Sequence, residues 1–154
     1  MNIVVCVKQI IDPEMPASIF KIDPEAKRAV PPKGMKLVVS DYDKNAVEAA
    51  LKLGDLHGGK VTVISLGSEA ITEAIRECIA MGVDEGILLN DSLFDDSNLY
   101  STAYAIAQAI KKIGEFDLVF CGREEGDWDG GQVGSGIAMF LGIPCVTTVG
   151  KMEV

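Results

Sequence analysis

The sequence predicts an α/β domain of three layers, with helices on both faces of a mostly parallel sheet. Apolar runs of strand length alternate along the chain with segments whose apolar residues recur at helical spacing. That alternation is typical of strand–helix–strand units, whose strands are buried on both faces. The chain has 154 residues, 48% of them hydrophobic and 24% charged, which suffices for one full hydrophobic core. We therefore expect a single domain over residues 1–154.

The chain begins with a predicted strand at residues 3–7, and a shorter strand is predicted at residues 37–39. Both are apolar runs made mostly of β-branched residues. Between them, residues 11–36 hold five of the six prolines, so we expect a long loop with a short hairpin around residues 20–22. An insertion of this length after a strand often carries function.

The first helix is predicted from the apolar spacing after this loop. Asp43 stands where a helix cap is expected, and His57 precedes two glycines that would end the helix. His57, the single histidine, is therefore expected to interact with the helix dipole rather than to act in catalysis. The apolar positions at helical spacing are Ala46, Val47, Ala50, Leu51 and Leu53.

The second half of the chain continues the alternation. Near-continuous apolar strands are predicted at residues 61–66, 86–89 and 118–121. Helices are predicted around residues 71–79, from about Ser97 or Leu99 to Ile113, and through residues 137–141. Residues 146–154 begin like another strand, so we expect a fragment that lacks a C-terminal extension.

Charge and hydropathy exclude several classes of partner. The net charge of −9, from 14 basic and 23 acidic side chains, argues against binding nucleic acid or an anionic membrane. No apolar run approaches the roughly 18 to 20 residues that span a bilayer, and the first residues are too short for a signal peptide. A cytoplasmic location is therefore expected.

Catalytic and metal-binding side chains are scarce. The four cysteines, Cys6, Cys78, Cys121 and Cys145, are far apart in apolar contexts and form no C-x-x-C pair. We interpret them as structural thiols. One histidine leaves no material for a histidine-based triad or a zinc site, so no catalytic and no metal residue is assigned.

The most informative segment is the acidic, glycine-rich turn that joins the apolar run 118–121 to the last helix. The start of a helix offers unpaired N–H groups and a positive dipole end, so it can hold a phosphate. Nucleotide binding is therefore the leading hypothesis. The alternative is that this segment only caps the start of the helix. Asp127 and Asp129 either accept hydrogen bonds from ribose hydroxyls or cap the helix. The other candidates in the turn are Gly122, Gly130, Gly131, Gln132, Val133 and Gly134.

Further candidates lie where other strands end. In an open parallel sheet, ligands bind beyond the carboxyl ends of the strands. Core packing is the alternative interpretation for Cys6 and Leu66. The candidates at these ends are Cys6 and Val7 after the first strand, Ser40 and Asp43 after the short one, and Leu66 and Gly67 after the third.

Common nucleotide motifs are absent. The first strand is followed by Lys8 and Gln9 without G-x-G-x-x-G, and neither a Walker A sequence nor a Ser-Gly-Gly loop occurs. Ribose and phosphate binding without cleavage remains. Lys8 and Arg123 either touch phosphate or form surface ion pairs, and the latter is favoured. Trp128 either stacks on a ring or anchors an interface.

Four ordered segments carry a family resemblance. They are residues 1–10, residues 45–51, residues 80–84, and the stretch from Cys121 to Gly134. With them the chain resembles the beta (small) subunit of electron transfer flavoproteins, specifically its N-terminal nucleotide-binding domain. The resemblance implies a Rossmann-like fold of the adenine nucleotide alpha hydrolase-like type.

The resemblance also implies cofactors and site roles. Beta subunits of this family bind AMP structurally or, in electron-bifurcating members, a second FAD whose electrons come from NADH. Carried over, Cys6, Ser40, Asp43 and Leu66 line adenine and ribose, and Gly130, Gly131, Gln132, Val133 and Gly134 hold phosphate. Gly131 and Val133 look closer to members with a second flavin, and Ser40-Asp41 replaces the usual Asn-Pro. FAD and AMP both stay open, with a lean to FAD.

The implied partners are an alpha subunit, in a heterodimer, and an acyl-CoA dehydrogenase or similar flavoenzyme. The expected role is that of an electron carrier subunit rather than a self-sufficient catalyst. The alternative is a stand-alone ATP- or AMP-binding module of the universal-stress type.

Overall fold

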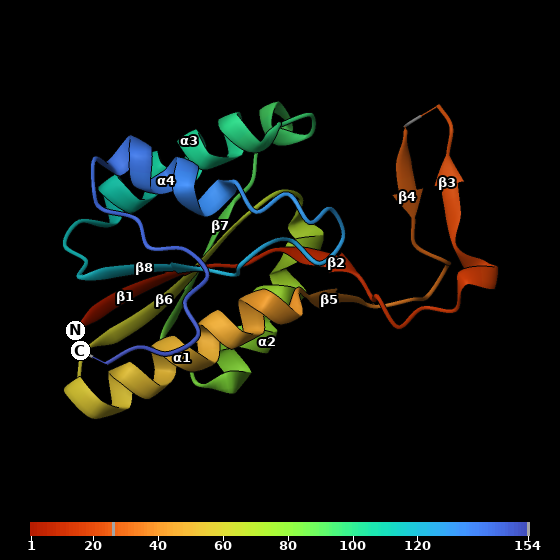
Figure 1. Cartoon of the computed structure of the whole chain (residues 1–154). Coiled ribbons are helices and arrows are strands. Elements are labelled where there is room, and N and C mark those ends of the chain that lie inside the picture. The colour runs from red at the N-terminus through yellow and green to blue at the C-terminus, as the bar shows by residue number, and fades with distance from the viewer. Residues whose placement is uncertain (26, 154) are drawn as a thin grey trace.

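The computed structural model describes residues 1–25 and 27–153, and it confirms the predicted three-layer arrangement. Four parallel strands form the central sheet in the order β7-β6-β1-β8. Helices α1 and α2 cover one face, and helices α3 and α4 cover the other (Figure 1). The bounds are β1 Asn2–Cys6, β6 Lys60–Leu66, β7 Glu85–Leu89, β8 Leu118–Cys121, α1 Asp41–His57, α2 Thr72–Met81, α3 Leu99–Ile113 and α4 Val133–Leu141.

The two faces of the sheet have separate hydrophobic cores, because successive side chains of a strand point to opposite faces. Ile3 and Val5 of β1 pack with residues of α1 and α2. Val4 and Cys6 of the same strand pack with residues of α3 and α4. The buried stripe of α3 is the one its spacing predicts, namely Ala103, Ile106, Ala107 and Ile110. This double burial explains why the strands of the sheet are mostly apolar.

The long segment after β1 forms two small antiparallel pairs. Strand β2 (Gln9–Ile11) pairs with β5 (Leu37–Val39), and β3 (Lys21–Asp23) pairs with β4 (Arg28–Val30). The β3–β4 hairpin projects away from the three layers (Figure 1). The predicted hairpin and the predicted strand at 37–39 are thus confirmed, although β5 lies outside the parallel sheet. The short 3-10 helices in the described residues are η1 Ala17–Ile19, η2 Glu69–Ile71 and η3 Ser92–Phe94.

The predicted strand at residues 146–154 is wrong. Residues 143–153 belong to no helix or strand, and residue 154 lies outside the described residues. Thr148 has φ 53°, in the left-handed region that an extended strand excludes. The apolar and β-branched residues of this segment therefore run as coil.

The predicted cap of the first helix is also wrong. Helix α1 begins at Asp41, and Ser40 occupies the N-cap position without a side-chain hydrogen bond. Asp43 lies within the first turn, and its carboxylate accepts hydrogen bonds from two other segments. The suggestion that Asp127 or Asp129 caps the last helix is wrong as well, because α4 begins at Val133 with Gln132 as its N-cap.

The predicted helix end at His57 is confirmed, since His57 is the last residue of α1 and Gly58 follows with positive φ. Helix α3 starts where Asn98 accepts a hydrogen bond from the backbone N–H of Ser101. Among residues 1–25 and 27–153, no helix is long and apolar enough to span a bilayer.

Candidate functional site

The candidate site lies at the carboxyl ends of β1 and β8. From β1 the chain crosses to β6 and β7 on one side, and it then returns to β8 on the other side of β1. Ligands of open parallel sheets bind in the crevice at such a reversal of strand order. The segments that follow β1 and β8 therefore meet where a ligand is expected (Figure 1).

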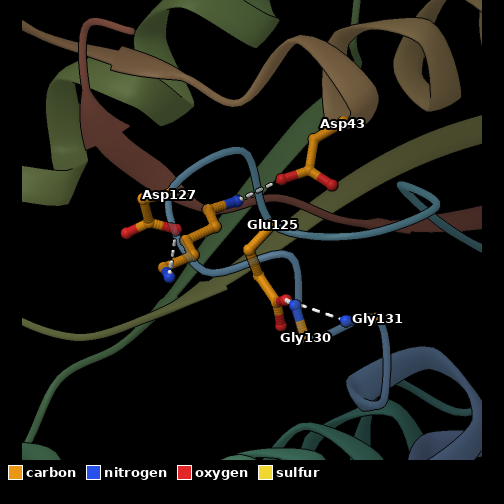
Figure 2. Close-up of polar contacts among 6 residues, drawn as sticks. Asp43, Glu125, Asp127, Gly130 and Gly131 are labelled. Atoms are coloured by element: carbon orange, nitrogen blue, oxygen red, sulfur yellow. Dashed lines mark hydrogen bonds and ion pairs between the residues drawn. The ribbon is translucent and has the colours of Figure 1, made fainter.

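Asp43 joins the segments that follow β1 and β8. Its Oδ2 accepts from the backbone N–H of Lys8 at 2.8 Å (Figure 2), and its Oδ1 accepts from the backbone N–H of Gly122 at 3.1 Å. Position 122 must be glycine in this arrangement, because a Cβ atom there would collide with the Asp43 carboxylate. Helix α1, β1 and β8 are thus connected through one side chain.

The Asp43 carboxyl group is almost buried, with 7% of the residue exposed. Burial raises the pKa of Asp43 from its ordinary value of 3.8 to about 7. The two backbone N–H donors and the charge of Lys8 oppose this rise of the pKa, and the charge of Glu125 adds to it. The connection between the strand ends therefore contains a group that titrates near neutral pH.

The glycine-rich turn holds a carboxylate of its own. Oε2 of Glu125 accepts hydrogen bonds from the backbone N–H groups of both Gly130 and Gly131, each at 3.0 Å (Figure 2). Gly131 has φ 58°, a conformation that favours glycine, and it lets two successive N–H groups converge on one oxygen. The turn thus binds an anionic group, but this group is a side chain of the same turn, so phosphate binding there stays a prediction. No sequence motif marks Glu125, so this residue is not among the predicted site residues.

Lys8 pairs with the same turn. Its Nζ lies 2.7 Å from Oδ1 of Asp127 (Figure 2), and both side chains are partly exposed. The favoured interpretation of Lys8 as part of an ion pair is confirmed. Arg123 lies 3.7 Å from Glu124. Trp128 is 78% exposed at the tip of the turn, so stacking on a ring and anchoring of an interface both stay predictions.

A cavity of about 420 Å³ opens between the end of β8, the start of α4 and the coil that follows α4. This volume is within the range of small-molecule sites. Among the predicted residues, Gly122, Gly131 and Gly134 line it, together with Arg123. The coil at residues 143–149 also lines it. These coil residues were missed because their apolar pattern resembles that of a strand.

The other predicted residues lie around this cavity rather than in its lining. Cys6 and Val7 are buried at the end of β1, and the Val7 carbonyl accepts from the Ser65 hydroxyl at 2.7 Å. Leu66 packs against the core beneath α3 and α4. The residues Gly67, Asp127, Asp129, Gly130, Gln132 and Val133 lie at the same edge of the sheet without lining the cavity.

Ser40 has an unusual environment. It is fully buried, and its hydroxyl has no hydrogen-bond partner among the described residues. A methyl group built on Gly126 of the glycine-rich turn would lie 3.5 Å from this hydroxyl oxygen. A buried hydroxyl without a partner is costly, so it is a suitable partner for a polar ligand group.

The cysteines are free thiols in different environments. Cys6 and Cys78 are buried and Cys121 is half-buried, whereas Cys145 is exposed and does not fit the interpretation as a structural thiol. Cys6 and Cys121 are register partners on neighbouring strands. A hydrogen bond from one thiol to the other, together with burial, raises the pKa of Cys6 well above its ordinary value.

The fold places the chain in the class of three-layer α/β domains, whose ligands bind at the carboxyl ends of the parallel strands. A family model described as "Electron transfer flavoprotein domain" matches residues 33–154. The chain belongs to the electron transfer flavoprotein family, as its four sequence segments indicated. Membership associates it with flavin.

Named relatives agree with this assignment. The chain is 44% identical over 154 residues to the electron transfer flavoprotein subunit beta of Thermoanaerobacterium thermosaccharolyticum, covering 100% of this chain and 57% of the relative. It is 45% identical to the subunit beta of Clostridium acetobutylicum, with the same coverage. It is 39% identical over 155 residues to the caffeyl-CoA reductase-Etf complex subunit CarD of Acetobacterium woodii, also covering 57% of that relative. The chain thus spans a little over half the length of these proteins.

Proposed function

We propose that residues 1–154 form the nucleotide-binding domain of an electron transfer flavoprotein beta subunit. The domain holds an adenine nucleotide, either FAD or AMP, and works with an alpha subunit to carry electrons between a dehydrogenase and an acceptor. The proposal depends mainly on one observation. The chain is a member of this family, and the N–H groups of Gly130 and Gly131 in its glycine-rich turn bind a carboxylate. A cytoplasmic location stays a prediction.

The residues at the site suit an adenine nucleotide. Gly134 and Arg123 line the cavity and offer a backbone N–H group and a cation to phosphate, while Gly131 lines it with its N–H group bound to Glu125. Ser40 offers its unpartnered buried hydroxyl, and Asp43 an acceptor, on the side where ribose would lie. The number and type of these groups support binding without cleavage.

The flavin, when bound, supplies the redox chemistry, and the protein positions it. The chain contributes binding and orientation through backbone groups and a few polar side chains. His57 lies at the end of α1, next to the start of β6 and therefore at the opposite edge of the sheet. It is too remote to act as an acid or base at this site.

The names of the relatives support a partner subunit. The first two are called subunit beta, and CarD is named as a subunit of a caffeyl-CoA reductase-Etf complex. We propose an electron transfer flavoprotein alpha subunit and an acyl-CoA dehydrogenase or similar flavoenzyme as partners of this chain. The universal-stress alternative has no support from these relatives.

The proposal is tested by co-expression with an alpha-type flavoprotein subunit. The complex is purified, its nucleotides are released with acid, and FAD and AMP are counted per heterodimer. Two FAD indicate a second flavin in this chain, and one FAD with one AMP indicates a structural nucleotide. Absence of a complex, together with no bound nucleotide in this chain, would refute the proposal.

A further inference from the structure

Glu125 occupies the position at which the glycine-rich turn would hold an anion. One of its carboxylate oxygens accepts from two successive backbone N–H groups, those of Gly130 and Gly131, at 3.0 Å each. The contact is close, because a Cβ atom on Gly130 would lie 3.0 Å from the same oxygen. Backbone N–H groups of this kind bind phosphate and carboxylate oxygens alike. A phosphate that used these donors would first have to displace Glu125.

The charge of the turn strengthens this competition. The four carboxylates within residues 122–131 are Glu124, Glu125, Asp127 and Asp129, and Arg123 is the only cation. Arg123 is paired with Glu124, and the nearby Lys8 is paired with Asp127. The cations are therefore largely neutralised by neighbours. A phosphate monoester, which carries a charge of about −1.5 to −2 at neutral pH, meets a surplus of negative charge here.

An independent feature indicates that the turn still receives a ligand. The hydroxyl of Ser40 is buried beneath Gly126 of this turn and has no partner among the described residues. It leaves a donor and an acceptor for a neutral polar group, such as a ribose hydroxyl. The turn thus combines an unpartnered hydroxyl beneath it, which suits a neutral group, with a carboxylate that competes with phosphate.

We propose that Glu125 is a specificity-determining residue, whose carboxylate disfavours a terminal phosphate such as that of AMP relative to the singly charged phosphodiesters of FAD. This inference rests on the proposed function and assigns the choice between its two nucleotides to one side chain. Each phosphate of FAD has fewer free oxygens and less charge than the terminal phosphate of AMP. FAD therefore depends less on the two N–H groups that Glu125 occupies.

The test is calorimetric titration of the full 154-residue chain, freed of nucleotide, with AMP and separately with FAD. Glu125→Ala frees the two N–H groups, and Glu125→Gln keeps an acceptor while removing the charge. Glu115→Gln is the charge control, because it removes one exposed carboxylate that lies before the start of β8, at the opposite end of that strand from the turn. Circular dichroism verifies that each variant is folded.

We expect AMP to bind about tenfold more tightly to Glu125→Ala than to the native chain, since a hydrogen bond to a charged group is worth this factor or more. The affinity for FAD, and the affinity of Glu115→Gln for AMP, should change by less than about threefold. Unchanged or weaker AMP binding by Glu125→Ala, with FAD still bound, would overturn the inference and leave the proposed function intact. Failure of the native chain and every folded variant to bind either nucleotide would overturn both.

Discussion

Replacing Asp43 with Asn tests the electrostatic account of the site most directly. The carboxyl group is nearly buried, and its pKa of about 7 in the folded chain compares with an ordinary value of 3.8. Between these two values the folded state binds the proton and the unfolded state does not. Stability that Asp43 contributes is therefore present at low pH and is lost as the pH rises through 7. Asn cannot ionise, so its variant lacks this loss.

The magnitude follows from the two pKa values. Between pH 5 and pH 8, the folded state holds the additional proton over about two pH units, each worth about 1.36 kcal/mol. The native chain should therefore lose about 2 to 3 kcal/mol relative to Asp43→Asn across this range. A constant offset is superimposed, because the amide nitrogen of Asn faces one of the two N–H donors, from Lys8 or Gly122, and leaves it unpaired.

The assay is urea unfolding of both chains at pH 5, 6, 7 and 8, at constant ionic strength. The difference in unfolding free energy cancels the contributions of the ionisable groups that the two chains share. We expect Asp43→Asn to become more stable relative to the native chain as the pH rises. Parallel stability profiles over this range would refute the assignment of a raised pKa to Asp43.

Three other predictions use the same fold. Gly122→Ala should cost about 2 kcal/mol or more in unfolding free energy, because its Cβ would collide with Asp43, whereas Gly150→Ala, with no atom near that position, should stay within about 0.5 kcal/mol in the same urea assay. Ile110→Ala, at a fully buried position, should lose about 2 to 5 kcal/mol by thermal or urea unfolding. In the native chain, a thiol reagent at pH 8 should label the exposed Cys145 first. Burial raises the pKa of Cys78 to about 11, so Cys78 should react only after unfolding. Rapid labelling of Cys78 would contradict its burial.

Much of the fold could be predicted because it depends on local periodicity. The apolar run at β8 and the buried stripe of α3 were both visible, since burial on two faces or on one stripe leaves a regular pattern in the sequence. The sequence also places the candidate site at the glycine-rich turn, because glycines and a helix start form a local motif, and ligand binding there stays a prediction. The hairpin β3–β4 followed from its flanking prolines and polar residues.

What the sequence could not show are the partners of individual side chains. Asp43 is of a residue type that often caps helices, yet its hydrogen-bond partners lie 35 and 79 residues away, at Lys8 and Gly122. Glu125 gives no local signal that its carboxylate turns back onto Gly130 and Gly131. The coil at residues 143–149 has the pattern of a strand but lines a cavity instead.

The sequence by itself therefore determined the class of fold and the family of the chain, and it predicted the edge of the sheet at which the candidate site lies. These depend on the period of apolar residues and on short motifs, which are properties of neighbouring residues. The tertiary structure alone decided which carboxylate is buried, which one occupies the anion-binding N–H groups and where the cavity opens. Those outcomes depend on desolvation and on hydrogen-bond geometry between distant segments, and both exist only when the strand ends have been brought together.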